Sequence, residues 1–493
     1  MGSEIFTDDP VWAGIDIGTQ GVRVALVDGR GKVLATGSAP LQSVRGPGRR
    51  HEQDPRDWWR AACAACAEAT AAVDAGRVRA LAVCSTSGTF LLADAAARPL
   101  TPALMYDDDR GGPYAERVGE EGRDLWARLS LRVQASWPLP KLLWLAAGGG
   151  LPAGARLLHS ADYLAAMLAG GLTATDSSHA LKTGYDSLNE RWPAEVLARL
   201  DLPGTLFGPV VRPGTPIGVV AAEAARLTGL PEGCQIIAGM TDGCAGQIAA
   251  GALTPGAGVS VLGTTLVLKG VSADLLHDPD GAVYSHRHPD GGWLPGGASN
   301  VGAGVLAAAF PGRDLADLDR RAARHEPAGQ VVYPLTARGE RFPFYRPDAE
   351  QVSVGRAGSE EEHYAALLQG VAYGERLGLA ALALLGAPVT GSLALVGGAT
   401  RSAYWSQLRA DVLGMPVEIP RHPEAAVGMA VLAAAGAAGE PLSRTAELMI
   451  PRGARVEPRP DRVERFEKSF ARLVEALVER EYVTPELAAE AVA

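Results

Sequence analysis

The stretch AGIDIGTQGVRVALVD, residues 13–28, decides the fold class of this 493-residue chain. Apolar residues within 15–17 and 22–26 mark two short strands, and Gly18 and Gly21 bracket the turn between them. A second turn, DGRGK, leads into the apolar run VLATGSA, so the pattern predicts an antiparallel β-meander. A dinucleotide-binding G-x-G-x-x-G or a P-loop would lead into a helix, and both are excluded because the chain returns as a strand.

The first turn predicts a phosphate site. The backbone N–H groups of Gly18-Thr19-Gln20-Gly21 and the Thr19 hydroxyl can close around phosphate oxygens. Asp16 stands inside an apolar strand, where a carboxylate is costly unless it is paired or linked to a metal. A Mg²⁺ bound partly through water and bridging to nucleotide phosphates would account for it. The alternative, a hairpin whose acid caps its own turn, stays open at this point.

The same hairpin pattern recurs near the middle of the chain. In GVSVLGTTLVLKG, residues 258–270, Gly263-Thr264-Thr265 aligns with Gly18-Thr19-Gln20, and Val261 takes the place of Asp16. An internal repeat of this length indicates duplicated domains. Two phosphate hairpins, with an acid on one alone, suit an asymmetric nucleoside triphosphate. Two unrelated hairpins are the alternative.

Two further segments place notable residues at strand ends. CQIIAGMTDGCAGQ predicts a buried strand that ends at Thr241, with Asp242 at the start of a helix, where the helix dipole favours a carboxylate. An ordinary helix cap is the alternative, but the position at the seam between the halves favours a catalytic acid. SLALVGGATRSAYW predicts a strand, Gly397-Gly398 and a helix, and glycines there let a ligand such as ribose or adenine approach the backbone.

The composition limits the class of protein. The length favours two domains, and 47% hydrophobic with 21% charged residues is globular composition. The net charge of −10 argues against nucleic acid as a main partner. No apolar run is long enough for a bilayer span, and no basic start with an apolar stretch precedes Trp12, so neither a membrane association nor a signal peptide is expected. The five cysteines suit free thiols in a cytoplasmic protein.

These motifs, in this order, resemble the FGGY family of carbohydrate kinases, from about Trp12 to about Gly439. The resemblance implies an α/β fold with two ribonuclease-H-like domains of the actin-like ATPase superfamily, facing each other across a nucleotide and sugar cleft. Residues 12–251 would form the N-terminal domain, with the sugar site and the first hairpin. Residues 252–439 would form the C-terminal domain, with the second hairpin and the adenosine site. Residues 440–493 would be a connector and a helix, 466–493, that packs on the body.

The resemblance also implies site residues, with ATP and Mg²⁺ as cosubstrates. Asp242 falls where the family places its catalytic base, and Asp16 where it places the acid near the metal and phosphates. The residues expected to bind the nucleotide are Gly18, Thr19, Gln20, Gly263, Thr264, Thr265, Gly397, Gly398, Ala399 and Ser402. The residues expected to bind the sugar are Gln20, Gly21, Arg23, Ser87, Asp107 and Asp242.

Three segments of the first half carry polar residues that suit a polyol: STSGT, MYDDDRG and DSSHALKTGYD. Turn chemistry and a solvated charge cluster are the alternatives. The segments resemble most the D-ribulose kinase-type, xylulose kinase-like subgroup, although Gln20 and the acidic run 107–109 depart from its pattern. Xylulose kinases usually show Met-His-Gly where this chain has Thr86-Ser87-Gly88. We therefore expect a ketopentose kinase, with D-ribulose ahead of D-xylulose or another polyol.

The alternatives to an active kinase are a nucleotide-binding regulator on the same fold and a kinase that has lost activity. A regulator would need neither Asp242 nor a polar sugar wall. A homodimer is possible, and the loop 339–350 would lie near the cleft or shape an oligomer contact.

Overall fold

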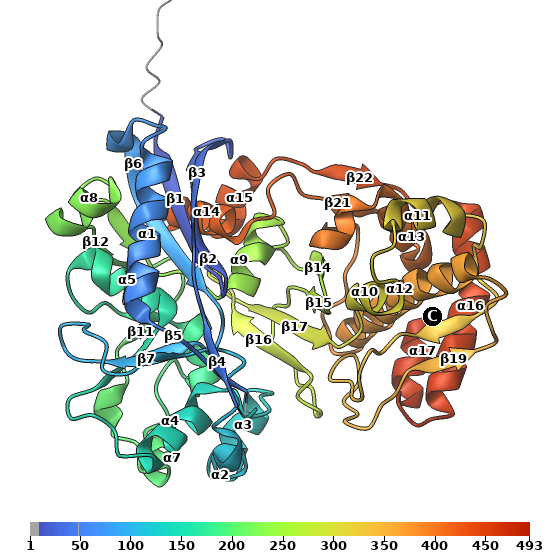
Figure 1. Ribbon diagram of the computed structural model, residues 1–493, viewed down its shortest axis with the longest axis horizontal. Coiled ribbons are helices and arrows are strands. Elements are labelled where there is room, and N and C mark those ends of the chain that lie inside the picture. Colours follow the sequence, from blue (N-terminus) through green and yellow to red (C-terminus); the bar gives the residue numbers. More distant parts are fainter. Residues whose placement is uncertain (1–8, 48) are drawn as a thin grey trace, which may run out of the picture. The chain divides into compact units, whose positions relative to one another are not determined.

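The computed structural model describes residues 9–47 and 49–493, and the first eight residues, which enter the expectation about a signal peptide, lie outside this part. The chain forms two compact units (Figure 1). Unit 1 holds the chain up to Gly251 together with His286–Gly291 and His422–Pro451, and unit 2 holds Ala252–Ser285, Gly292–Arg421 and Arg452–Ala493. The units therefore differ from the continuous ranges expected from the sequence, because two later segments join unit 1.

The main sheet of unit 1 contains the predicted meander. Its strand order is β12 (Pro216–Val219), β13 (Gln235–Ile237), β6 (Val78–Ser85), β1 (Val11–Ile17), β2 (Gly21–Asp28) and β3 (Val33–Pro40). β1 is antiparallel to β2 and β2 to β3, which confirms the prediction from residues 13–28. β1, β6 and β13 run parallel to one another, so their carboxyl ends lie at one edge of the sheet.

Helices cover both faces of this sheet (Figure 1). Ala13 and Ile15 share a buried core with Ala65 of α1 (Pro55–Thr70) and with α5 (Ser160–Ala169). Gly14 faces the other way, where α14 (Ala425–Ala438) and α9 (Asp242–Ala249) pack. A Cβ at Gly14 would lie 1.7 Å from the carbonyl oxygen of Ala426, so only glycine lets α14 lie this close to β1.

A second sheet in unit 1 contains the strands next to two of the predicted sugar segments, STSGT and MYDDDRG. Its order is β4 (Val44–Gly46), β5 (Arg50–Gln53), β8 (Ala103–Leu104), β7 (Phe90–Ala93) and β9 (Arg156–His159). β10 (Thr175–Asp176) pairs with β11 (Val210–Val211). The remaining helices of unit 1 are α2 (Ala115–Glu121), α3 (Arg123–Arg128), α4 (Pro138–Ala147), α6 (Ser177–Ala180), α7 (Ala194–Arg199), α8 (Ala222–Thr228) and α15 (Leu442–Met449).

The main sheet of unit 2 repeats that of unit 1. Its order is β16 (Val283–Arg287), β17 (Trp293–Ser299), β15 (Leu266–Lys269), β14 (Gly258–Leu262), β20 (Leu393–Val396), β21 (Val417–Ile419) and β22 (Ala454–Val456). β14 is antiparallel to β15 and parallel to β20, as β1 is to β2 and β6. The order and directions of β13-β6-β1-β2-β3 therefore recur in β21-β20-β14-β15-β17, which supports the duplication predicted from the two hairpins.

The core of unit 2 forms around α12 (Glu360–Leu384), with α10 (Gly304–Ala309), α11 (Leu315–Ala322) and α13 (Ala403–Leu413). β18 (Val331–Tyr333) pairs with β19 (Val352–Val354). The loop 339–350 belongs to this core, because Phe342 and Phe344 are buried in it. Buried Glu340 accepts hydrogen bonds from Ser299 Oγ at 2.8 Å and Tyr333 OH at 2.7 Å.

The C-terminal segment forms two helices, α16 (Pro460–Val478) and α17 (Pro485–Val492), so the single helix predicted for 466–493 is wrong. Thr484 caps α17 by accepting from the N–H of Leu487, and Pro485 occupies the first helical turn. Phe470 and Leu473 of α16 are buried in the core of unit 2. Among the described residues, no helix has both the length and the apolar character needed to cross a membrane.

Candidate active site

Asp16 is a buried carboxylate on β1. Its Oδ2 accepts from Arg23 Nη1 of the adjacent strand at 3.1 Å, and the Cys84 thiol of β6 lies 3.6 Å from its Oδ1. Burial, followed by the negative charge of Asp242, raises the pKa of Asp16 to about 6, and the nearby Arg23 guanidinium opposes this rise. Asp16 is thus buried beside groups from outside its own hairpin, and capping of its own turn does not account for these contacts.

Asp242 is the first residue of α9, directly after the strand β13 and the loop that ends at Thr241. Thr241 forms a parallel bridge with Ser85, the last residue of β6. Because Cys84 and Ser85 pair with Asp16 and Ile17 of β1, the two acids lie at the same edge of the sheet. The charge of Asp242 acts on both Asp16 and Cys84. The structure thus brings together the two acids predicted from the sequence.

The first turn is held by a side chain that sequence reasoning missed. Gly18 N–H donates to the carbonyl of Gly21 at 3.0 Å, and Gln53 Nε2 donates to the carbonyl of Thr19 at 2.8 Å. Gln53 is buried and accepts from the indole N–H of Trp58 at 2.6 Å. The carbonyls of Thr19 and Gly21 and the N–H of Gly18 are therefore engaged within the protein.

Two of the residues predicted to bind substrates have internal roles as well. Gln20 is exposed on the turn, and its carbonyl accepts from the N–H of Leu41 at 2.9 Å. A Cβ at Gly21 would lie 2.7 Å from the carbonyl oxygen of Ala39, so this glycine lets β2 and β3 approach closely.

The second turn is held by the backbone. The N–H groups of Ala303 and Gly304 donate to the carbonyls of Gly263 at 2.9 Å and Thr264 at 3.1 Å, and Gly263 N–H donates to Thr265. No atom lies within 4 Å of a Cβ built on Gly263, so this part of the turn is open to a ligand.

The glycine pair after β20 lies beside this turn within unit 2. Gly397 has a φ of 102°, and a Cβ there would lie 2.4 Å from the carbonyl oxygen of Leu262, which precedes Gly263. Gly398 begins a short 3₁₀ turn that includes the buried Ala399. Ser402 caps α13 by accepting from Trp405 N–H at 2.9 Å, and it donates to Asp319 Oδ2 at 2.7 Å. Its hydroxyl is therefore engaged within the protein.

Two of the predicted sugar segments, STSGT and MYDDDRG, meet at Lys141 of α4, a residue that sequence reasoning did not assign. Its ammonium group is fully buried and donates to the carbonyls of Gly88 at 2.9 Å and Met105 at 2.8 Å. Burial lowers the pKa of Lys141 to about 7, against the opposing effect of Asp108 and Asp107. Lys141 thus joins the STSGT segment to the MYDDDRG segment.

Ser87 and Asp107 differ in whether their polar side-chain atoms have hydrogen-bond partners. The buried Oγ of Ser87 has no hydrogen-bond partner among the described residues. Asp107 accepts a short contact from His51 Nδ1 and pairs with Arg45 at 3.4 Å. A hydroxyl without a partner at a predicted sugar wall fits a site that binds hydroxyl groups, because a buried polar atom without a partner is costly.

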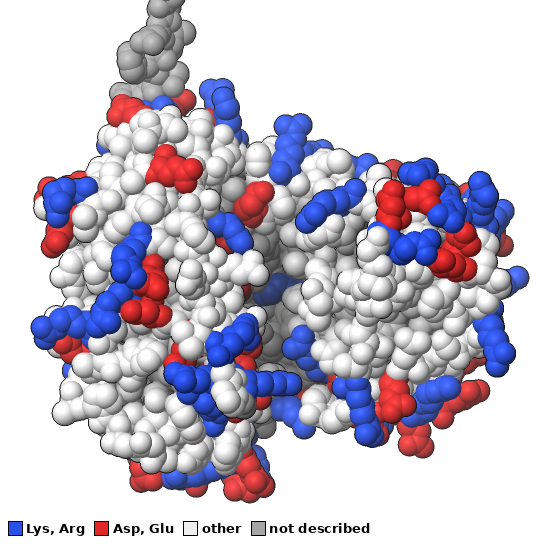
Figure 2. Space-filling model, in the orientation of Figure 1, with Lys and Arg blue, Asp and Glu red and all other residues white. Residues whose placement is uncertain are grey.

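Asp107 belongs to a network of charges rather than to an isolated acidic run. Figure 2 shows basic side chains beside acidic ones over the β4 region of unit 1. Buried Asp108 pairs with Arg110 at 2.7 Å, and Arg110 also pairs with Glu52 at 2.7 Å. The alternative of a solvated charge cluster is therefore wrong for Asp108. It fits better for Asp109, which lies 3.7 Å from the exposed Arg49.

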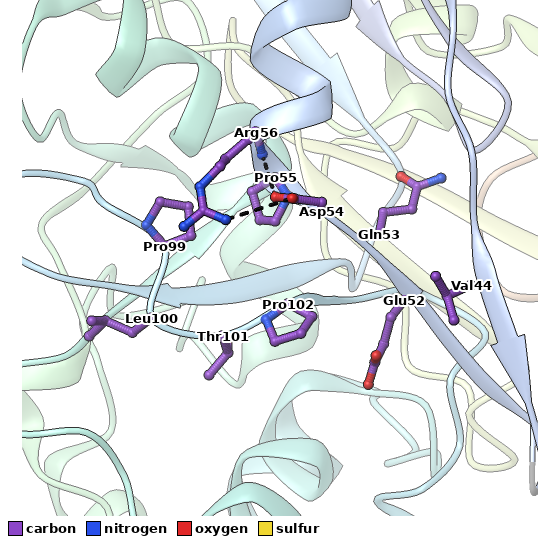
Figure 3. Close-up of a pocket in the computed structure, with 10 residues that line it drawn as sticks. All are labelled: Val44, Glu52, Gln53, Asp54, Pro55, Arg56, Pro99, Leu100, Thr101 and Pro102. Carbon is purple, nitrogen blue, oxygen red and sulfur yellow. Dashed lines mark hydrogen bonds and ion pairs between the residues drawn. The ribbon is translucent and has the colours of Figure 1, made fainter.

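A cavity of about 340 Å³ lies beside β5, and Figure 3 shows its lining. Asp54 and Arg56 face each other in it, with Arg56 N–H donating to Asp54 Oδ1 at 2.9 Å. Gln53 lines its edge and also contacts the turn at Thr19. None of the residues predicted to bind substrates lines this cavity, and Gln53 connects it to the first turn.

The DSSHALKTGYD segment contributes a buried histidine that sequence reasoning passed over. Burial lowers the pKa of His179, but the carboxylates of Asp176, Asp162 and Asp242 outweigh it and raise this pKa. By contrast, buried Asp186 accepts from the N–H groups of Leu188 and Asn189 at 3.1 Å, which is turn chemistry.

Comparison with known proteins identifies the class of this site. Residues 11–249 match the N-terminal domain, and residues 258–437 the C-terminal domain, of the FGGY family of carbohydrate kinases. The chain belongs to this family. It is therefore an ATP-dependent carbohydrate kinase, a transferase that acts on an alcohol group, as the sequence resemblance implied.

Individual relatives cover almost the whole kinase. It is 33% identical over 491 residues to a xylulose kinase of Streptomyces coelicolor (strain ATCC BAA-471 / A3(2) / M145), covering 95% of this chain and 96% of the relative. Its structure resembles the xyloylose kinase from Brucella ovis with a TM-score of 0.86 at 26% identity, over 96% of this chain and 99% of that one. A xylulose kinase from Rhodospirillum rubrum matches with a TM-score of 0.85 at 27% identity, over 96% and 99%.

Proposed function

We propose that this kinase transfers the γ-phosphoryl group of ATP to the primary hydroxyl of a ketopentose, with D-xylulose as the leading acceptor. The observation that carries the proposal is the pair of acids at one sheet edge, Asp16 on β1 and Asp242 at the start of α9. The names of the similar kinases from Streptomyces coelicolor and Rhodospirillum rubrum support xylulose over the ribulose expected from sequence motifs.

In this proposal Asp242 is the catalytic base. Phosphoryl transfer depends on positioning and charge neutralisation more than on covalent chemistry. Asp242 orients the acceptor hydroxyl and accepts its proton as the bond to phosphorus forms. Its place in the first turn of α9 favours the ionised carboxylate that this role needs.

We assign Mg²⁺ to Asp16. A carboxylate oxygen is the kind of ligand that Mg²⁺ prefers, and a cation would offset the charge that Asp16 and Asp242 place close together. Residues 9–47 and 49–493 contain no group of three or more His, Cys, Asp or Glu able to hold a metal ion. This fits an ion that is bound mainly by the nucleotide phosphates and water, with one carboxylate from the protein.

The nucleotide-binding assignments rest on the turns and the glycine pair. The open backbone at Gly263 and the amides of Thr264 and Thr265 suit phosphate oxygens, as does the turn at Gly18 and Thr19. The glycine pair after β20 suits the adenosine, with Ser402 acting through its cap of α13.

D-ribulose is the second candidate acceptor, and one observation favours it. The chain has Thr86-Ser87-Gly88 where xylulose kinases of this family usually show Met-His-Gly. This segment contains the Ser87 hydroxyl that has no partner among the described residues. A difference at this wall would change which sugar hydroxyls are recognised.

We also propose a cytoplasmic enzyme, because Cys63 and Cys66 are free thiols on α1 and suit a reducing compartment. A homodimer stays a prediction.

The test is ADP release with D-xylulose, D-ribulose, other ketopentoses and glycerol, followed by Asp242→Asn with the preferred sugar. We expect sugar-dependent turnover with the highest kcat/KM for D-xylulose. Asp242→Asn should lower kcat by about 100-fold to 10,000-fold with ATP affinity nearly unchanged. ADP release that ignores every sugar would point to a regulator, and ATP binding without turnover would point to a silent kinase.

A further inference from the structure

The turn that contains α6 contacts two parts of the candidate active site: Ser85 at the end of β6, and Thr241 directly before Asp242. Asp176 caps α6 by accepting from the N–H groups of Ser178 at 2.9 Å and His179 at 2.8 Å. Its Oδ2 also accepts from His179 Nδ1 at 2.6 Å. The imidazole of His179 is therefore held at one nitrogen by a carboxylate of its own turn.

The other nitrogen of this ring reaches the sheet. His179 Nε2 lies 2.9 Å from the hydroxyl of Ser85, the last residue of β6. Both side chains are fully buried. Ser85 forms the parallel bridge with Thr241, the residue directly before Asp242. A chain of contacts thus runs from Asp176 through His179 and Ser85 to the backbone of the proposed base.

A second contact from α6 reaches the same backbone. The Ser178 hydroxyl accepts from the N–H of Thr241 at 3.2 Å and lies 3.2 Å from its hydroxyl. It also lies 3.0 Å from Nδ1 of His286, in one of the two later segments that join unit 1. Because Ser178 and His179 are adjacent, α6 contacts the residue before Asp242 both directly and through Ser85.

We propose that His179 is a positioning residue for Asp242: by holding Ser85 at the end of β6, it fixes the backbone that presents the proposed base to the acceptor hydroxyl. His179 itself does not need to touch a substrate in this role. The inference rests on the proposed function, since it requires Asp242 to act as the base. Misplacement of a catalytic group by about 1 Å can cost on the order of 100-fold in rate.

The chain supplies a matched control in His159. This histidine is also buried, pairs through Nδ1 with an acid three residues later, Asp162, at 2.7 Å, and has its ring 5.7 Å from that of His179. Its Nε2, however, lies 2.8 Å from the hydroxyl of Thr183 rather than from a strand end of the main sheet. Substitution of either histidine removes a buried contact between an imidazole and a carboxylate. Only substitution of His179 also removes the contact with Ser85.

The experiment compares His179→Gln and His159→Gln by steady-state kinetics and thermal unfolding. We expect kcat of His179→Gln to fall by about 10-fold to 100-fold, with the KM for ATP unchanged, and that of His159→Gln to stay within about threefold. In the Asp242→Asn background, His179→Gln should cause no further loss, because residues that act through one group are not additive. If His179→Gln does not fold, Ser85→Ala replaces it and should lower kcat in the same direction.

Four outcomes overturn the inference. These are unchanged kcat in His179→Gln, equal losses in both histidine variants that follow their unfolding temperatures, a change in sugar KM alone, or a full additional loss on the Asp242→Asn background. Absence of sugar-dependent turnover in the wild type is a different result, because it refutes the proposed function itself. Wild-type turnover that survives in His179→Gln refutes the positioning role alone.

Discussion

The hairpin β1–β2 of unit 1 and the hairpin β14–β15 of unit 2 share a backbone plan and differ in their side chains. Each joins two antiparallel strands in the middle of a sheet with the same strand order. In the first, Asp16 is paired across the strands with Arg23. In the second, the corresponding pair is Val261 with Val267. The two copies therefore share the backbone arrangement, but only the first hairpin has an acid at this position.

The two turns are also held differently. A side chain, Gln53, fixes the carbonyl of Thr19, whereas backbone N–H groups fix the carbonyls of the second turn. The second arrangement needs glycine at two neighbouring positions, because a Cβ at Gly302 or Gly304 would lie 2.3 or 2.9 Å from atoms of Thr264. One turn therefore depends on a distant side chain and the other on close backbone packing.

The largest effect should come from removing the acid that distinguishes the hairpins. Asp16→Asn should lower kcat by about 100-fold or more, because it removes the carboxylate assigned to Mg²⁺, the cation that would offset the negative charge of the transferring phosphoryl group. Val261→Thr, at the matching position of the second hairpin, should change kcat by less than about threefold if the second hairpin contributes backbone rather than side chains. Steady-state ADP release with saturating ATP and sugar measures both. Similar losses in the two variants would contradict the asymmetry.

The same acid should reduce stability as the pH rises. The pKa of Asp16 is about 6 in the folded protein against 3.8 for an ordinary aspartate, so folding favours its protonated form. Ionisation of Asp16 therefore lowers the free energy of unfolding. This loss is absent below about pH 4, grows up to about pH 6, and is on the order of 3 kcal/mol above that. Asp16→Asn cannot ionise, and should therefore unfold at a higher temperature than the wild type at neutral pH.

Arg23→Gln is the control for this prediction. Its guanidinium opposes the rise in the pKa of Asp16, so its loss should lower stability at neutral pH and have little effect below about pH 4. Thermal unfolding without nucleotide, followed across this pH range, measures both variants. An Asp16→Asn advantage that does not change with pH would contradict the electrostatic origin.

Substitutions at two glycines of unit 2, Gly397 and Gly263, distinguish the effect of backbone strain from the loss of contact with a ligand. Gly397→Ala should destabilise the protein by about 1–3 kcal/mol, because its φ is positive and the new Cβ would overlap the carbonyl of Leu262. Gly263→Ala meets no atom within 4 Å and should leave the unfolding temperature nearly unchanged. A raised KM for ATP in Gly263→Ala would therefore report contact with the nucleotide. Unchanged ATP binding in that variant would argue against the second turn as a phosphate site.

Local patterns made much of this site predictable. The apolar runs around 18–21 and 263–265 fixed both hairpins, and the strand before Asp242 placed the acid at a helix start. Composition and local spacing identified these elements because each depends on neighbours a few residues away. The separate last helix could also have been predicted from the sequence, since Thr484-Pro485 is a typical signal for the start of a helix.

Long-range contacts account for what the sequence could not indicate. Gln53 lies 34 residues from Thr19, and His179 lies 94 residues from Ser85. Lys141 joins two carbonyls in other segments, and nothing in its own helix signals this. No local pattern identifies such partners, because the fold alone decides which distant groups meet.

The smallest expected effect tests the side-chain support of the first turn. Gln53→Met removes the hydrogen bond to Thr19 and should raise the KM for ATP by roughly fivefold, about 1 kcal/mol, with kcat unchanged. It also removes the hydrogen bond from Gln53 Nε2 to Ser43 Oγ and leaves the indole N–H of Trp58 without its acceptor, so lost stability alone could imitate the effect. Trp58→Phe removes that second bond but keeps the contact with Thr19, and should therefore leave the KM for ATP unchanged. Equal increases in both variants would mean that packing around Gln53, rather than its contact with the turn, controls ATP binding.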